Sequence, residues 1–302
     1  MQLGIKKALS RRSLVKPNAL YYFWKYATNA SRTKAAKTHT PSFPDVHTIA
    51  EEITREGIVT GNVADFLSHE GLEHFAGAKA EVLELSRSEE VQRMLAAQNA
   101  TGEFRYNSSK DFLVNLIVPK TVHPADGPIL RLALDPKLLE VVSDYLGLWP
   151  RLFQINSWVN FPTEEPPKAS QMWHRDPEDL RVIKVFIYLV DVDEDTGPFT
   201  FIPRTHPFGE FAGCVPHHKD RKRVEDQEMN PILSPDLHRI CTGPADTMIL
   251  ADTVGYHRGG KPRSKNRILL TFTYTSAWQN KPGPQITGTP SWSMNDMQRM
   301  AL

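Results

Sequence analysis

Residues 172–190 read MWHRDPEDLRVIKVFIYLV, and this stretch combines two metal-binding residue types with a β-prone run. His174 and Asp176 are two positions apart, so their side chains project to the same side of an extended chain. The run 182–190 is rich in β-branched and aromatic residues, which is typical of a buried strand. The stretch therefore predicts a metal site beside a β-sheet.

A His-x-Asp triplet is weak evidence by itself. With 11 His and 17 Asp in 302 residues, chance alone gives about 0.6 such triplets (11 × 17/302). A second triplet, His218-Lys219-Asp220, occurs in a charge-dense loop that lacks a neighbouring strand pattern. We therefore place the metal site at His174 and Asp176.

The chain changes character near Pro150. Before this residue, apolar side chains recur at helical spacing over 45–98, with Asp45 as a candidate N-cap, and again from Asp135 to a stop at Gly147. After it, β-prone runs alternate with turn residues, and strands are expected at 151–161, 182–190, 198–203, 246–251 and 267–276. Many short strands separated by turns favour a sandwich or a jelly roll.

His257 and Arg267 complete the candidate site. An iron(II) ion that also binds a bidentate cosubstrate and oxygen uses three protein ligands, normally two His and one carboxylate, and His257 is the third candidate. A guanidinium is the best bidentate partner for the far carboxylate of a dicarboxylate cosubstrate. If His257 ends one strand and Arg267 begins the neighbouring antiparallel strand, both reach the same inner face. The alternative for Arg267 is an exposed charge at a strand edge.

The composition is that of an ordinary globular protein, with 40% hydrophobic and 24% charged residues. A formal net charge of +1 gives no reason to expect nucleic-acid binding, and no apolar run approaches the ~20 residues of a membrane span. Two cysteines are too few for a disulfide framework, so a cytoplasmic location is expected. Residues 1–44 hold nine Lys or Arg and no acid, which predicts a basic arm: a disordered tail, an organelle import signal or a lipid-touching segment.

Several motifs together resemble the phytanoyl-CoA dioxygenase family of iron(II)/2-oxoglutarate oxygenases. They are Met172-Trp173-His174-Arg175-Asp176, the strand 184–190, Asp195-Thr196-Gly197-Pro198-Phe199, Phe201-Ile202-Pro203-Arg204-Thr205-His206, and Tyr256-His257-Arg258-Gly259 through Arg267. The resemblance implies a mainly β fold, a double-stranded β-helix (jelly-roll, cupin-like) barrel with N-terminal helices packed against it. It also implies that iron(II), 2-oxoglutarate and O2 are used to hydroxylate a small-molecule substrate, with release of succinate and CO2.

The same resemblance assigns further site residues. Asn156, Tyr188 and Lys120 are expected to contact 2-oxoglutarate, beside Arg267 as its carboxylate anchor. Interior packing is the alternative for Asn156 and Tyr188. The family often carries a hydroxyl residue two positions after the last His, where this chain has Gly259.

One catalytic domain is expected over 45–302, made of helical support over 45–149, a β core over 150–276 and a C-terminal tail over 277–302. The long polar segment 207–238 is a candidate lid. Two other functions stay open. One is a jelly-roll protein that binds metal or senses 2-oxoglutarate without turnover, and the other is a cupin-type hydrolase or isomerase with the same three ligands.

Overall fold

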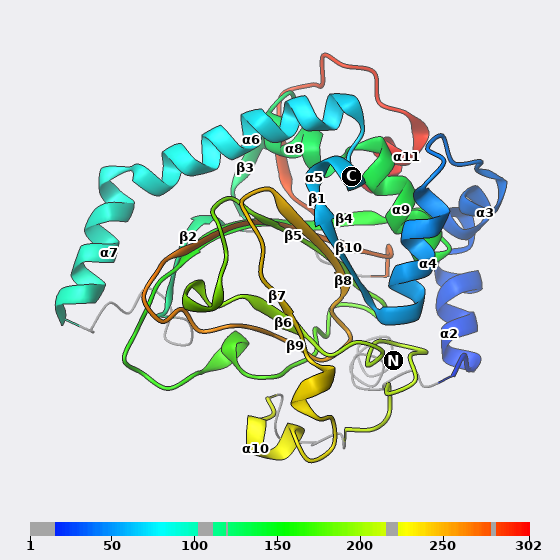
Figure 1. Ribbon diagram of the computed structural model, residues 1–302. Helices are drawn as coiled ribbons and strands as arrows, with labels where there is room; N and C mark the ends of the chain where they lie inside the picture. The colour runs from blue at the N-terminus through cyan, green and yellow to red at the C-terminus, as the bar shows by residue number, and fades with distance from the viewer. Residues whose placement is uncertain (1–15, 102–110, 119, 216–222, 279–281) are drawn as a thin grey trace.

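The computed structural model describes residues 16–101, 111–118, 120–215, 223–278 and 282–302 (Figure 1). The strands are β1 (Ile58–Asn62), β2 (Leu113–Ile117), β3 (Val122–Pro124), β4 (Arg151–Asn160), β5 (Ile183–Tyr188), β6 (Phe199–Phe201), β7 (Arg239–Cys241), β8 (Thr247–Asp252), β9 (His257–Gly259), β10 (Arg267–Thr275) and β11 (Gln285–Thr287).

The α-helices are α2 (Ala19–Phe23), α3 (Ala30–Thr38), α4 (Val46–Glu56), α5 (Val63–Phe66), α6 (His69–Arg87), α7 (Glu89–Thr101), α8 (Pro128–Ala133), α9 (Pro136–Leu146), α10 (Asp226–Met229) and α11 (Asp296–Ala301). A π-helix, η1 (Trp24–Thr28), follows α2, and short 3-10 helices are η2 (Ala169–Gln171), η3 (Glu194–Thr196) and η4 (Pro235–Leu237). Among the described residues, no helix combines the length and the apolar character needed to cross a membrane.

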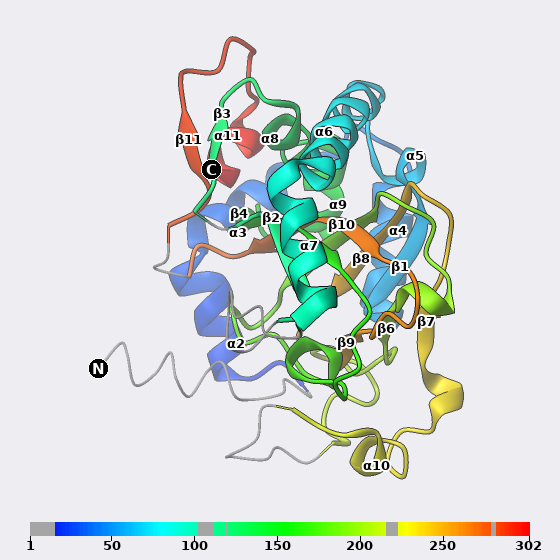
Figure 2. The ribbon, with the colours of Figure 1, turned by 90° about the vertical axis from the view of Figure 1, so that its left-hand side faces the viewer.

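Two β-sheets face each other. The larger one has six strands in the order β1-β8-β5-β10-β4-β2, and every neighbouring pair is antiparallel. A three-stranded antiparallel sheet, β7-β6-β9, lies against one face of it (Figures 1 and 2). β11 and β3 form a separate parallel pair. The fold is therefore a β core with helices, as the sequence predicts.

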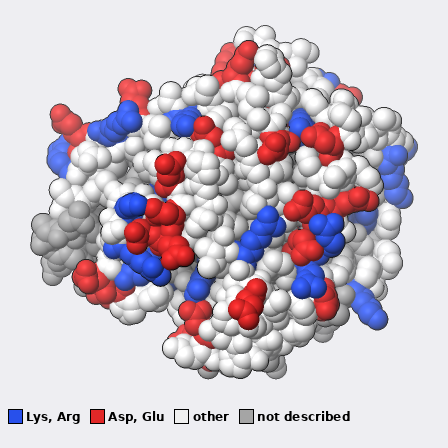
Figure 3. All heavy atoms as spheres, viewed as in Figure 1, with Lys and Arg blue, Asp and Glu red and all other residues white. Residues whose placement is uncertain are grey.

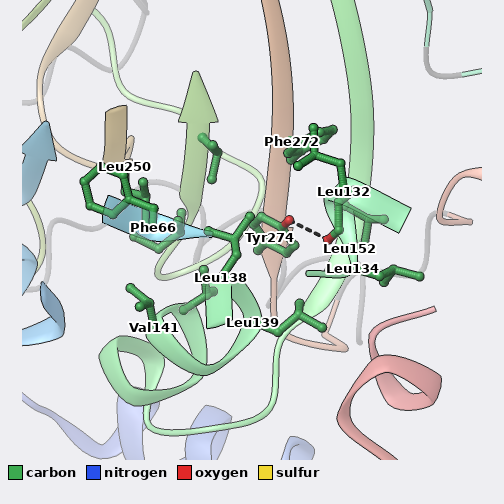
Figure 4. Close-up of a cluster of buried hydrophobic side chains, with 14 of the residues drawn as sticks. Phe66, Leu132, Leu134, Leu138, Leu139, Val141, Leu152, Leu250, Phe272 and Tyr274 are labelled. Carbon is green, nitrogen blue, oxygen red and sulfur yellow. Dashed lines mark hydrogen bonds between the residues drawn. The ribbon is translucent and has the colours of Figure 1, made fainter. Parts of the chain in front are cut away.

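Helices cover the other face of the six-stranded sheet, where α6, α8 and α9 lie above it in Figure 1. Leu138 and Val141 of α9 pack there with Phe272 and Tyr274 of β10 (Figure 4). The hydroxyl of Tyr274 donates a hydrogen bond to the carbonyl oxygen of Ala133 at 2.7 Å, so its one polar atom is satisfied inside this core. This helical layer gives one face of the six-stranded sheet a buried support.

The space between the two sheets, here called the inter-sheet space, is lined from both sides. Because side chains alternate along a strand, Phe186 and Tyr188 of β5 point away from the helical core. They pack with Leu269 of β10 and with Phe199 and Phe201 of β6. The polar residues of the candidate site lie at the end of this apolar lining.

The five strands expected from the sequence are confirmed as β4, β5, β6, β8 and β10. The other strands of the two facing sheets are only three to five residues long, as in β9 and β1. Runs this short contain too few alternations to show a period of two, so sequence reasoning missed them.

The helical pattern expected over 45–98 was wrong at one point. α4 ends at Glu56, because Gly57 adopts a left-handed conformation with φ of 79° that closes the helix. Ile58, which continued the apolar spacing, instead begins β1 and pairs with Ala251 of β8. Sheet pairing thus overrides helical periodicity over five residues, and α5 then resumes the helix.

The helix expected after Asp135 is confirmed as α9. The carboxylate of Asp135 accepts a hydrogen bond from the backbone N–H of Leu138 at 3.0 Å, and Gly147 ends the helix with φ of 65°. The expected N-cap at Asp45 is only partly confirmed. Asp45 does precede α4, but its carboxylate pairs with Lys137 at 2.7 Å instead of capping the helix.

Residues 16–44 form packed helices where the sequence predicts an arm. Trp24 is 1% exposed, and its Nε1 donates to the carboxylate of Asp179 at 2.9 Å and to the hydroxyl of Ser276 at 3.0 Å. Both partners lie more than 150 residues away in the sequence, so a local pattern cannot reveal this anchor. Residues 1–15 of the expected arm lie outside the described part of the chain.

Candidate metal centre

Backbone pairing brings the two candidate His ligands together. The N–H of His174 donates to the carbonyl of His257 at 2.9 Å, and the N–H of His257 donates back at 3.0 Å. This reciprocal antiparallel pair places the two residues directly opposite each other. Their imidazole rings lie with centroids 4.2 Å apart. Two residues far apart in the sequence thereby become neighbours in one ladder.

The backbone at 174–176 is extended, so successive side chains point to opposite sides of the chain. His174 and Asp176 point to one side. Arg175 points to the other, where its guanidinium donates to the carbonyls of Val254 at 2.6 Å and Thr205 at 2.8 Å. Because Arg175 is held by backbone carbonyls, the orientation of its two neighbours is fixed as well.

The three candidate ligands form a compact buried group. One donor atom from each of His174, Asp176 and His257 lies within 4.8 Å of the other two. The carboxylate of Asp176 is 3.9 Å from Nε2 of His174 and 3.7 Å from Nε2 of His257. His174 is 6% exposed and His257 is 3% exposed. The grouping expected from the sequence is thus present in the structure.

Both imidazoles are prepared to bind a metal through Nε2. Nδ1 of His174 lies 2.9 Å from the carbonyl of Met172, and Nδ1 of His257 lies 3.0 Å from the carbonyl of Gly255. A carbonyl only accepts, so Nδ1 carries the proton in each ring and Nε2 presents its lone pair. Burial lowers the pKa of both rings, and that of His174 falls well below its usual value. Both are therefore neutral at pH 7.

The carboxylate of Asp176 is held ionised by its neighbours. Burial alone would raise its pKa, but the charge of the Lys184 ammonium and its hydrogen bond to the carboxylate outweigh burial and hold the pKa well below its usual range. Nζ of Lys184 lies 2.6 Å from Oδ2 of Asp176. Lys184 is itself largely buried, and burial would lower its pKa, but Asp176 and then Glu178 raise it. The pair is charged on both sides at pH 7.

The donor set fits iron(II). Two neutral imidazoles and one carboxylate, presented by His174, His257 and Asp176, are the ligand types that non-haem iron(II) oxygenases use. Three protein donors leave further coordination positions for other ligands. The arrangement can therefore hold a metal ion and, beside it, a chelating small molecule.

Arg267 is a buried guanidinium that the described protein satisfies only in part. It begins β10 and is 3% exposed, and Nη2 donates to Oδ1 of Asn160 on β4 at 3.2 Å. Its Nε and Nη1 have no hydrogen-bond partner within the described residues. Burial lowers the pKa of Arg267 to about 10, so it stays charged at pH 7. Unpaired buried donors on a charge are costly, which favours a bound anion as their partner.

Arg267 faces the strand that carries His257. A Cβ atom placed on Gly259, two residues after His257 in β9, would lie 3.4 Å from Nη2 of Arg267. The expectation that His257 ends a strand next to β10 was wrong, because His257 begins β9 and the two strands belong to different sheets. The Arg267 side chain nevertheless approaches β9 at Gly259, across the inter-sheet space. The alternative of an exposed strand-edge arginine is excluded by its burial.

The three other expected site residues differ in their surroundings. The hydroxyl of Tyr188 donates to the carbonyl of Cys241 at 2.7 Å and accepts from the N–H of Phe199 at 3.1 Å, so its proton already joins the two sheets. Asn156 is half-buried in the middle of β4. Lys120 is exposed, in the turn between β2 and β3. Contacts of these three with a cosubstrate stay predictions.

Two residues near the site were missed by sequence reasoning, Lys184 and Asn160. Lys184 is the one charged residue within 182–190, and a single charge inside a β-prone run is a signal that could have found it. Asn160 lies four positions after Asn156, on the same face of β4, but its contact with Arg267 depends on strand register. Register across distant strands is not visible in the sequence.

The segment expected to be a lid, 207–238, is packed where the structure describes it. The N–H of Val224 donates to the carbonyl of Trp173 at 2.9 Å, in an antiparallel bridge. Val215, Met229 and other side chains of the segment are buried beside Trp173. The residues 216–222, which contain the second His-x-Asp triplet, lie outside the described part.

An ion pair also ties this segment to both ligand-bearing strands. The carboxylate of Asp226 accepts from Nε1 of Trp173 at 2.7 Å and from the guanidinium of Arg258 at 2.7 and 2.9 Å. The Arg258 guanidinium also stacks on the Trp173 ring, with its carbon 4.4 Å from the ring centroid. Trp173 precedes His174 and Arg258 follows His257, so Asp226 clamps the backbone on either side of the ligand pair.

Comparison with solved structures finds proteins of similar size with low sequence identity. EctD from S. alaskensis, with 2-oxoglutarate and 5-hydroxyectoine, is 20% identical over 80% of this chain and 80% of its own, with a TM-score of 0.49. The epimerase SnoN, in complex with Fe3+, alpha ketoglutarate and nogalamycin RO, is 16% identical over 81% and 96%, with a TM-score of 0.48. HygX from Streptomyces hygroscopicus, with nickel and 2-oxoglutarate, is 14% identical over 76% and 87%, with a TM-score of 0.45. None of these likenesses identifies the substrate of this chain.

The sequence was also compared with curated proteins and with models of protein families. No curated protein matches the chain. The family model of phytanoyl-CoA dioxygenase (PhyH) matches residues 62–234, a range that includes His174 and Asp176 and ends before His257 and Arg267. This match spans more than half of the chain. The protein therefore belongs to the phytanoyl-CoA dioxygenase family of iron(II)/2-oxoglutarate-dependent oxygenases.

Proposed function

We propose that this protein is an iron(II)- and 2-oxoglutarate-dependent dioxygenase that hydroxylates a small-molecule substrate and releases succinate and CO2. One observation carries the proposal: a buried group of two neutral imidazoles and a carboxylate faces the same inter-sheet space as the partly unpaired guanidinium of Arg267. A metal-binding group alone would fit many functions. The added buried cation matches a cosubstrate that chelates a metal and ends in a second carboxylate.

The ligand group assigns a role to each donor atom. Nε2 of His174, Nε2 of His257 and the carboxylate of Asp176 would hold iron(II), which when bound would supply the redox chemistry with O2. The Nδ1 hydrogen bonds to backbone carbonyls fix both imidazoles in the ligating tautomer. The Lys184 ammonium hydrogen-bonds Oδ2 of Asp176 and so orients the carboxylate, whose Oδ1 lies 3.9 Å from Nε2 of His174 and whose Oδ2 lies 3.7 Å from Nε2 of His257.

Arg267 receives the far carboxylate of 2-oxoglutarate. Among the described residues Nε and Nη1 have no partner, so the guanidinium keeps donors that a carboxylate can occupy. Asn160 accepts from the remaining Nη2 and so sets the plane of the group. A carboxylate bound there would be held in one orientation relative to the candidate metal ligands.

Apolar and tightly held parts of the chain surround this site and would limit the access of water to it. Phe186 and Phe199 line the inter-sheet space next to His257, with the Phe199 ring centroid 5.6 Å from that of His257. The clamp of Asp226 on Trp173 and Arg258 keeps the segment 223–238 against the ligand pair. Exclusion of water protects a reactive site and strengthens its electrostatic contacts.

We further propose that the two facing sheets are the halves of a double-stranded β-helix, with residues 45–302 as one catalytic domain. The helical support over 45–149, the β core over 150–276 and the tail over 277–302 are its parts. Two sheets that share one lined interior are what this fold requires.

Cosubstrate binding tests the metal group and the anchor separately. Anaerobic addition of Fe(II) and then 2-oxoglutarate is expected to give a visible metal-to-ligand charge-transfer band. His174→Ala should abolish the band, and Arg267→Ala should shift its appearance to much higher 2-oxoglutarate concentration. His47→Ala and Arg263→Ala are matched controls, because these side chains are 72% and 69% exposed. A wild-type protein that binds Fe(II) but gives no band would contradict the proposal.

Turnover separates the proposal from its alternatives. A panel of small molecules should include at least one that accelerates succinate release and appears as a hydroxylated product by mass spectrometry. A 2-oxoglutarate sensor would give the band without any such acceleration. A cupin-type hydrolase or isomerase would act without 2-oxoglutarate, and Arg267→Ala would leave its activity intact.

A further inference from the structure

An aromatic face projects from the first helical segment of the described chain. Tyr22, Phe23 and Tyr26, on α2 and η1, are 52%, 52% and 48% exposed. The other exposed large hydrophobic residues of the described part are scattered singly over distant elements (Leu85, Val122, Ile232 and Ile240). Single exposed apolar residues are ordinary, but three aromatics within five positions form a patch that calls for a partner.

The opposite side of the same helical segment is buried, and this fixes the three aromatic rings of the patch on the outside. Tyr21 and Trp24 are buried there, and Trp24 is hydrogen-bonded to Asp179 and Ser276 in the protein interior. The rings of Tyr22 and Tyr26 stack with centroids 6.3 Å apart. Because the inward side is anchored, the outward rings cannot turn into the core, and their exposure is built into the fold.

The segment that carries the patch is rich in lysine and free of acidic residues. The described residues 16–44 carry Lys16, Lys25, Arg32, Lys34 and Lys37 and no Asp or Glu. Nζ of Lys37 lies 4.9 Å from the centroid of the Tyr26 ring. Lysine and arginine side chains are seen along the edge of the molecule formed by α2 and α3, at the right in Figure 3. Four more cations and no acid occur in the sequence of residues 1–15.

We propose that Tyr22, Phe23 and Tyr26, with the neighbouring lysines, form a docking surface for an anionic lipid bilayer. Tyrosine and phenylalanine beside lysine are the residue types of membrane interfaces, because the ring enters the acyl boundary while the hydroxyl and the ammonium stay among the headgroups. The acid-free stretch supplies the attraction to anionic lipids.

The size of the patch favours a bilayer over a protein partner. Three rings that are each half exposed present on the order of 300 Å² of surface. A stable protein interface needs about 800 Å² from each partner. A bilayer has no such minimum, because a shallow set of aromatic anchors and a field of cations add to each other without shape complementarity.

Vesicle co-sedimentation of the full chain tests this surface independently of any enzymatic activity. We expect binding to vesicles of phosphatidylcholine mixed with phosphatidylserine, weakened by added salt, and little binding to phosphatidylcholine alone. The triple variant Tyr22→Ser, Phe23→Ser, Tyr26→Ser should bind the mixed vesicles roughly ten-fold more weakly. The matched control is Val122→Ser with Ile240→Ser, which removes residues 51% and 54% exposed on other elements and should bind as the wild type does.

A second variant guards against loss of folding in the first. Lys34→Gln with Lys37→Gln touches no buried side chain and should also weaken binding, with a reduced salt dependence. Equal binding to both vesicle types, or undiminished binding by the triple variant, would overturn the proposal. So would binding that disappears when residues 2–15 are deleted but survives the triple variant, or a wild-type dimer that the triple variant converts to a monomer.

Discussion

The Lys184 ammonium lies 2.6 Å from Oδ2 of Asp176, inside the inter-sheet space. The contact joins a buried cation to the carboxylate of the candidate metal group. It also leaves the other carboxylate oxygen of Asp176 on the side of His174, 3.9 Å from its Nε2. The lysine therefore decides which way the carboxylate points.

Lys184→Met tests this orienting role, because methionine keeps most of the length and removes the ammonium. We expect metal affinity to fall about 10- to 100-fold, as is usual when the partner of a ligand is removed. Titration with Co(II) or Ni(II), followed by calorimetry, measures it. Lys265→Met is the matched control, since Lys265 is 57% exposed and pairs with Asp193 away from the site. Unchanged metal binding by Lys184→Met would show that the ammonium does not orient the ligand, and tighter binding would show that its repulsion of the metal ion dominates.

Asn160 is expected to act through Arg267. Asn160→Ser shortens the side chain that accepts from Nη2, so the guanidinium loses its orientation but keeps its charge. The KM for 2-oxoglutarate should rise about ten-fold, with kcat little changed. Asn156→Ser serves as the comparison on the same strand. If it raises the KM and Asn160→Ser does not, the cosubstrate contact belongs to Asn156, as the family resemblance implies.

Gly197 carries a packing constraint at the start of β6. Its φ is 70°, and an added Cβ would lie 2.5 Å from the carbonyl oxygen of Gly260. Gly197→Ala should lower the free energy of unfolding by about 2–4 kcal/mol, through backbone strain and a clash with backbone. Gly288→Ala provides the control, because φ is 81° there but nothing lies within 4 Å of the added atom, so only about 1 kcal/mol is expected. Urea denaturation measures both, and equal losses would exclude the clash with Gly260.

His206 predicts a pH dependence of stability. It is a buried loop histidine, 1% exposed, and burial lowers its pKa. Below the usual pKa of about 6.5 the unfolded chain takes up this proton and the folded chain does not, so stability falls with falling pH until the folded pKa is reached. The contribution is at most about 1.4 kcal/mol per pH unit.

Urea denaturation between pH 7.5 and 5.5 checks this prediction. His206→Gln, whose amide nitrogen can replace Nε2 as a donor to the carbonyl of Thr54 and which does not titrate, should be less stable at pH 7.5 but should lose less stability on acidification. A slope identical to that of the wild type would assign the pH dependence to other groups.

Sequence reasoning singled out His174, Asp176 and Arg267 because each has a recognisable chemical type and lies beside a strong strand pattern. His174 and Asp176 precede β5, and Arg267 begins β10, both of which were expected. What the sequence did not contain was the geometry that joins them. Two contacts depend on the register between strands that are distant in the sequence: the pairing of His174 with His257 and the hydrogen bond of Arg267 to Asn160. Local periodicity does not predict such a register.

The errors also have physical causes. Ile58 fits a helical spacing, but Gly57 ends the helix and the open edge of β8 recruits the next residues as a strand. Residues 16–44 look like a basic tail in composition, yet one buried tryptophan with two distant partners is enough to anchor them. In both places, a tertiary contact overrides what composition and spacing indicate locally.

The reciprocal backbone pair of His174 and His257 links the strand register at this point to the completeness of the candidate metal group. A slip of one residue between these two segments would set Arg258 or Tyr256 opposite His174 and turn one imidazole out of the group. Chains with that error would lack the third donor. An ion bound by all three residues would stabilise the correctly paired fold and would not stabilise the slipped one. Metal binding would therefore increase the population of chains in which these two segments have the correct register.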